Sequence, residues 1–102
     1  MSESLSHDTF SLLRKDFELP EVTADFDEEK AISTFSKVIA YMLDREFECL
    51  LQICYRIDLG EEKLKKILHL SEPDQVAPDL ARALWNRQKQ KIEIRKRYSA
   101  NE

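Results

Sequence analysis

The sequence predicts an all-α protein in which four helices pack as a small bundle-like single domain. Among its 102 residues are one glycine and three prolines, and 35% of the residues are charged. This composition favours helix, and no alternating apolar run of the strand type is present. Apolar side chains instead return every three or four residues, as in helices that bury one face. We expect one domain over 1–102, with disordered ends at 1–7 and 99–102.

The first predicted helix is short. Phe10, Leu13 and Phe17 repeat at helical spacing, and Asp8 is available as a start signal. Pro20 ends the helix, because proline has no amide hydrogen and disfavours helical angles at the residue before it. A connector then leads to the second helix.

The second predicted helix, residues 26–57, is the longest and lies at the centre of the bundle. The segment Asp25-Phe26-Asp27-Glu28 has the form of a capping box, which starts a helix by satisfying its first amide groups. Its apolar side chains hold the helical phase for seven turns: Ile32, Phe35, Ile39, Met42, Leu43, Phe47, Leu50, Leu51, Ile53, Cys54 and Ile57. A face this wide contacts more than one neighbouring helix.

One acidic residue, Glu46, falls within this apolar face and is the candidate buried charge. A carboxylate on an apolar face must be paired, hydrogen-bonded or neutralised. Two interpretations remain open: Glu46 pairs with a base of the last helix, such as Arg87 or Lys91, or the helix bends near residue 44 and returns it to water.

A structural elbow is predicted at Arg56, Asp58 and Gly60. The segment Asp58-Leu59-Gly60-Glu61 again has capping-box form, so Asp58 is expected to close one helix and open the next. Gly60 gives the turn its conformational freedom. A short helix at 61–70 follows and buries Leu64, Ile67 and Leu68.

The last predicted helix, residues 78–98, has two apolar faces. Leu80, Leu84, Ile94 and Tyr98 form the face expected to contact the core. Because that face already supplies the core contact, we expect the other apolar pair at an interface together with three bases that repeat every seven residues. These candidate interface residues are Trp85, Ile92, Arg82, Lys89 and Lys96.

The charge distribution is uneven. Residues 1–79 hold nine Lys and Arg against eighteen Asp and Glu, whereas residues 80–102 hold seven against two. The net charge of −4 argues against general attraction to nucleic acid or to an anionic membrane. The basic last helix is expected to be a solvated face that complements the acidic body.

The residues that carry chemistry do not assemble into a recognisable site. His7 and His69 have no partners at metal-ligand spacing, and a single glycine excludes a glycine-rich phosphate loop. We therefore predict no catalytic residues, no metal, no cofactor and no enzymatic activity. Cys49 and Cys54 are five residues apart on one helix and cannot bridge there, so Cys54 is read as core and Cys49 as a flank position.

The expected location is the cytoplasm. No apolar run is long enough to cross a bilayer, and the polar start differs from a signal peptide. The two cysteines fit a reducing compartment.

A resemblance rests on motifs in the segment 47–68. It reads Phe-x-x-Leu-hydrophobic-Gln, then Tyr-Arg-Ile-Asp, then Glu-x-Lys-hydrophobic, and an Arg-Gln pair follows at 87–88. Over 28–98 the chain resembles a small uncharacterised bacterial family of all-helical proteins. The resemblance implies a cytoplasmic helical protein without an assigned activity, and it brings no catalytic residues. Gly60 stands where this pattern leads us to expect serine.

Together these features favour a protein-interaction or self-associating module, most simply a homodimer, since a small core leaves apolar area for a second copy. An unidentified protein partner is the other possibility. The alternative function is a helix-turn-helix-like nucleic-acid-binding regulator that uses helix 61–70 and the basic C-terminal helix. Its acidic start at Glu61 and Glu62 opposes an approach to phosphates.

Overall fold

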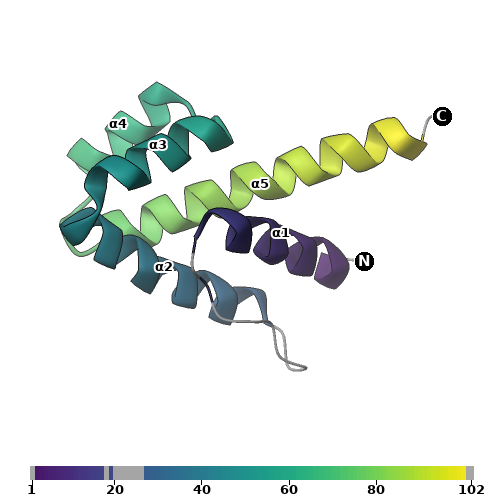
Figure 1. Cartoon of the computed structure of the whole chain (residues 1–102), viewed down its shortest axis with the longest axis horizontal. Coiled ribbons are helices and arrows are strands. Elements are labelled where there is room, and N and C mark those ends of the chain that lie inside the picture. Colours follow the sequence, from purple (N-terminus) through teal and green to yellow (C-terminus); the bar gives the residue numbers. More distant parts are fainter. Residues whose placement is uncertain (1, 18, 20–26, 101–102) are drawn as a thin grey trace.

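The computed structural model describes residues 2–17, 19 and 27–100 (Figure 1). Within this part of the chain there are five helices: α1 Ser2–Asp16, α2 Glu28–Arg45, α3 Phe47–Ile57, α4 Glu61–Leu70 and α5 Val76–Ala100. The all-α prediction is confirmed. The expected number of four helices is wrong, because the stretch predicted as one helix contains both α2 and α3. In the described residues, no helix has the length and apolarity needed to cross a membrane.

The two terminal helices are longer than the sequence suggested. α1 begins at Ser2 rather than near Asp8, and α5 runs from Val76 to Ala100 rather than over 78–98. Most of the end residues expected to be disordered therefore lie within helices. Residue 1 and residues 101–102 lie outside the described part.

The helix α5 forms the centre of the fold and contacts each of the other four (Figure 1). α1 and α2 lie along it and run in the opposite direction, and α3 and α4 pack near its N-terminal half. The start of α2 is capped by Asp27, whose carboxylate accepts a hydrogen bond from the Glu29 amide at 2.9 Å. Asp25, where the sequence predicted the cap, lies outside the described residues.

The core is built from large apolar side chains of every helix. The largest fully buried ones are Trp85, Phe35, Leu13, Ile39, Leu50, Ile57, Leu80 and Leu84. Aromatic rings join the three central helices: Phe17 meets Phe35 edge-on at 4.8 Å between ring centroids, and Phe10 contacts Trp85 at 6.2 Å. Such ring pairs add to the free energy gained by burying their surface.

The buried face of α5 differs from the predicted one. Trp85 has no exposed surface, so its assignment to an interface is wrong, whereas Ile94 is 40% exposed and does not belong to the core face. Leu84 is buried as expected, and the side chain of Tyr98 lies outside the described part. The buried arc is wide because α1 and α2 cover α5 from two sides, and its middle is the buried amide Gln88.

The indole nitrogen of Trp85 is the one buried side-chain polar atom without a hydrogen-bond partner among the described residues. An unpaired buried N–H group costs about 1–3 kcal/mol. The large aromatic surface that Trp85 removes from water offsets this cost.

Leu84→Ala and Ile94→Ala test the orientation of α5, because the sequence pattern places both residues on one face. We expect Leu84→Ala to lower the free energy of unfolding by about 2–5 kcal/mol. Ile94→Ala should change it by less than about 0.5 kcal/mol, since its side chain is partly in water. Urea unfolding followed by circular dichroism measures both values, and similar losses in the two variants would contradict the orientation.

Candidate functional site

A one-residue break separates α2 from α3. At Glu46 the backbone leaves helical angles (φ −139°, ψ 49°). The hydrogen bonds nevertheless continue across it: the Glu46 amide donates to the Met42 carbonyl at 2.8 Å, and the Glu46 carbonyl accepts from the Leu50 amide at 3.0 Å. The chain therefore changes direction here while both adjoining backbone groups stay bonded.

The break explains how a carboxylate is accommodated in the middle of an apolar stripe. In an unbroken helix Glu46 would point into the core, whereas in the structure it is exposed. Of the two interpretations, a bend close to residue 44 is confirmed. Pairing of Glu46 with Arg87 or Lys91 is wrong, because the Arg87 guanidinium bonds Asp58 and Gln90, and among the described residues Glu46 forms no ion pair.

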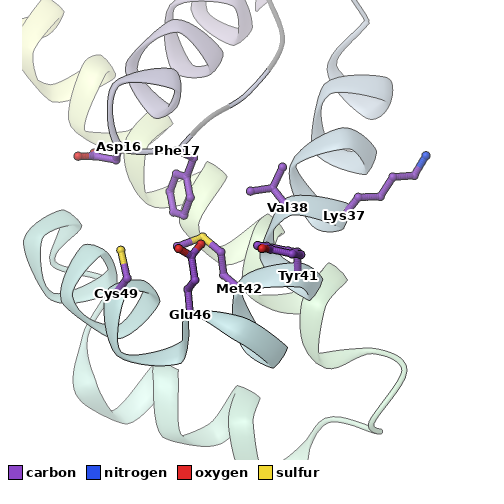
Figure 2. Close-up of a pocket in the computed structure, with 8 residues that line it drawn as sticks. All are labelled: Asp16, Phe17, Lys37, Val38, Tyr41, Met42, Glu46 and Cys49. Atoms are coloured by element: carbon purple, nitrogen blue, oxygen red, sulfur yellow. The ribbon is translucent and has the colours of Figure 1, made fainter.

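The bend opens a pocket of about 450 Å³, which we call the α2–α3 pocket (Figure 2). Its lining comes from the end of α1, from α2 and from the start of α3: Asp16, Phe17, Lys37, Val38, Tyr41, Met42, Glu46 and Cys49. Segments that are distant in the sequence therefore meet at one site.

The pocket has an apolar interior and charged flanks. Figure 2 shows the Glu46 side chain reaching toward Phe17 and Met42, while Lys37 extends away on the flank opposite Asp16. Tyr41 lines the pocket and is 59% exposed. The lining therefore combines apolar, aromatic and charged side chains.

The sequence indicated Glu46 but missed the residues around it. Tyr41 and Lys37 lie off the apolar stripe of α2, so the pattern treats them as solvated positions. The only sequence signal for the pocket was the aromatic residue Tyr41 at a position that the pattern assigns to solvent. It was not sufficient, since the contribution of Phe17 depends on how α1 packs.

The two cysteines occupy different environments, as predicted. Cys49 is exposed at the pocket, whereas Cys54 is buried in the core. Burial disfavours the charged thiolate and raises the pKa of Cys54 to about 11. Cys49 is therefore the accessible thiol of the pair.

The elbow between α3 and α4 is built differently from the predicted capping box. Asp58 ends α3 in the left-handed conformation (φ 65°). The Asp58 amide donates to the Tyr55 carbonyl at 3.0 Å, and the Leu59 amide donates to the Cys54 carbonyl at 3.1 Å. This is a Schellman ending, in which aspartate takes the usual place of glycine. Gly60 (φ 103°) is the N-cap residue of α4 and supplies no side-chain hydrogen bond, so the expectation that Asp58 caps this helix is wrong.

Two charged contacts fasten the elbow to the body. Arg87 donates to the Asp58 carbonyl at 3.0 Å and to its carboxylate at 3.2 Å. Arg56 donates to Asp16 of α1 at 3.0 Å. Partial burial and the nearby Arg87 guanidinium both lower the pKa of Lys91. Arg56 and Asp58 thus link α3 to α1 and α5.

The bases predicted to form an interface on α5 are used within the chain. Arg82 pairs with Glu29 at 2.9 Å and Lys89 with Glu28 at 3.1 Å, both at the start of α2. Lys96 pairs with Asp8 of α1 at 3.1 Å.

Ile92 is only 9% exposed, so neither apolar member of the predicted interface is freely available. Like the bases, it is occupied by contacts within the chain. The pairs of Arg82, Lys89 and Lys96 with carboxylates of α1 and α2 instead agree with the expectation that the basic helix complements the acidic body.

Searches against family models, curated proteins and solved structures gave no match. The resemblance noted from the Tyr-Arg-Ile-Asp motif therefore stays a prediction. Among the described residues, no three His, Cys, Asp or Glu side chains gather closely enough to hold a metal ion.

The two thiols should react at very different rates. In native protein at pH 8 we expect a thiol reagent such as Ellman's reagent to modify Cys49 within minutes and Cys54 only after unfolding, because burial keeps Cys54 protonated and covered. Absorbance at the released thiolate's band counts the thiols. Cys49→Ser should remove the fast phase, and two fast thiols in native protein would contradict the placement of Cys54.

Proposed function

We propose that the protein is a non-enzymatic interaction module that associates with itself, as a homodimer, through the α2–α3 pocket. The observation that carries the proposal is the exposed Tyr41 beside a pocket floored by Phe17 and Met42. We assign its action to the cytoplasm of a bacterial cell, in keeping with its unbridged cysteines.

Exposed apolar side chains support an interaction role for the part of the molecule formed by α2, α3 and α4. Of the large hydrophobic residues exposed in the described part, four of five lie in α2, α3 or α4: Tyr41, Phe47, Tyr55 and Leu70. On α3, Phe47, Leu51 and Tyr55 follow one another at intervals of four residues and form a stripe beside the core-facing side chains. Tyrosine and phenylalanine are enriched where proteins meet.

Charge supports a second copy as the occupant. The pocket has a base, Lys37, on one flank, and the acid Glu46 reaches toward its apolar interior (Figure 2). In a dimer with twofold symmetry, every contact between two different residues occurs twice, once in each direction. Lys37 of one copy can therefore face Glu46 of the other, and the same pair forms again across the symmetry axis. Tyr41 then enters the partner's apolar pocket, where its ring is removed from water.

Charge reversal tests this pairing. Lys37→Glu and Glu46→Lys should each weaken the dimer about tenfold or more, because like charges then face each other at two places. The double variant Lys37→Glu/Glu46→Lys should regain most of the affinity. Sedimentation equilibrium measures the dissociation constant, and circular dichroism checks that each variant is folded.

Lys30→Glu is the matched control, because Lys30 is an exposed lysine on the same helix two turns away and outside the pocket. It should leave the dimer unchanged. A protein that sediments as a monomer up to millimolar concentration, or a double variant no better than the single ones, would remove the basis for the proposal.

Nucleic-acid binding is the second candidate function, and the shape of the α3–α4 unit favours it. Two short helices are joined by a three-residue turn, and α4 exposes Lys63, Lys65 and Lys66. Against it, Lys65 pairs with Glu61 at 3.4 Å, and three of the α5 bases, Arg82, Lys89 and Lys96, are held by carboxylates. We rank this function below self-association for that reason.

A salt titration separates the two functions. If α4 binds duplex DNA, retention at low ionic strength should fall steeply as salt rises, and Lys63→Ala/Lys66→Ala should reduce the slope by about two. Self-association without nucleic-acid binding instead predicts no retention of duplex DNA of about 30 base pairs at about 20 mM salt, where charge screening is weak. Fluorescence anisotropy of labelled DNA measures the binding.

A further inference from the structure

We propose that a groove between α1 and α5 binds an acidic segment of a partner protein. The groove, which we call the α1–α5 groove, has a volume of about 300 Å³ and is separate from the α2–α3 pocket. It is lined by Asp8, Ser11, Leu12 and Lys15 of α1 and by Ile92, Arg95 and Lys96 of α5.

The groove is basic although the chain as a whole has a net charge of −4. Three cationic side chains, Lys15, Arg95 and Lys96, surround it, against the single carboxylate of Asp8. Within the described part of the chain, no carboxylate forms an ion pair with Lys15 or Arg95, and both side chains are exposed. A positive site on an acidic surface attracts carboxylates and orients an approaching acidic partner.

The floor of the groove is apolar. Leu12 is half-buried, and Ile92 is buried with 9% of its surface exposed; both line the groove, and Leu12 offers the more accessible apolar surface. An inorganic anion would use only the charged rim, whereas a peptide can place an apolar side chain on the floor and acidic side chains on the rim. The geometry therefore fits a segment in which carboxylates flank an apolar residue.

Other polyanions fit the groove less well. A nucleic acid or an anionic membrane carries a long row of charges, and the acidic remainder of the chain would repel it beyond these three bases. A short acidic peptide avoids this repulsion because its charge is confined to the groove.

The ion pair between Lys96 and Asp8 shows how the groove holds a carboxylate. The Lys96 ammonium lies 3.1 Å from the Asp8 carboxylate, and about half of each side chain is exposed. Exposed pairs of this kind contribute little to stability. A partner's carboxylate can therefore take the place of Asp8 at small cost.

A fluorescein-labelled peptide that repeats Glu-Glu-Leu is the probe, and fluorescence anisotropy at low salt measures its binding to the full chain. We expect Lys15→Glu/Arg95→Glu to weaken binding about tenfold or more, because two attractive charges become repulsive. The matched variant Lys63→Glu/Lys66→Glu makes the same charge change on α4 and should weaken binding by less than about threefold through the general field.

Asp8→Asn provides a test that loss of folding cannot mimic. Removing the competing carboxylate frees Lys96, so this variant should bind the probe about two- to fivefold more tightly. A peptide of glutamate alone should bind more weakly than the leucine-containing probe, because it leaves the floor of the groove empty.

Several results would overturn the proposal. They are an equal loss in the two double variants, unchanged or weaker binding by Asp8→Asn, equal affinity for the glutamate peptide, and tighter binding of single-stranded DNA or anionic vesicles than of the probe. Lys15→Glu/Arg95→Glu should leave the sedimentation mass unchanged, and Lys37→Glu should leave probe binding unchanged. Failure of the groove and failure of the dimer are thus distinguishable.

Discussion

The fold depends on burial of the apolar face of α5. This helix packs against α1, α2, α3 and α4, and the side chains of Leu80, Leu84 and Trp85 are completely removed from water between them. Each of these side chains contributes about 1.5–3 kcal/mol through its burial. In a chain of this size such terms are a large share of the net stability, so the other helices take their positions from α5.

Charge sets the alignment of helices that hydrophobic burial holds together. Lys96 with Asp8, Lys89 with Glu28 and Arg82 with Glu29 join the basic helix to both of its long neighbours. Exposed pairs are individually weak, and these are at least partly exposed. Their use here is to favour one antiparallel register, because a shifted helix would separate these pairs. The same pairs reduce the number of bases free for an external polyanion.

Two surface features arise where this packing is incomplete. At Glu46 the chain breaks its longest apolar stripe, and the resulting pocket exposes Tyr41. Between α1 and α5, the bases Lys15 and Arg95 stay without carboxylate partners in the described part of the chain. One surface combines an aromatic side chain with charges of both signs, which suits a second copy. The other combines an apolar floor with positive charge, which suits an acidic segment.

The sequence by itself determined the helical class, the core of α2 and α3 apart from Phe47, which is 41% exposed, the burial of Cys54 and the place of the turn at Asp58 and Gly60. These are local properties, because helical phase and turn chemistry depend on neighbouring residues. Even the break at Glu46 was one of two predicted outcomes. The periodic pattern could not choose between them, since Leu50 and Ile53 keep the phase of α2 on the far side of the break.

Only the tertiary structure decided which face of α5 is buried, which carboxylate each base meets, and where the pockets lie. Trp85 was read as an interface residue because one helix face was assumed to be enough for the core, whereas α1 and α2 together cover a wider arc. The α2–α3 pocket unites Phe17, Met42 and Cys49 from three helical segments. Such a site depends on distances between segments far apart in the chain, and sequence periodicity contains no measure of those distances.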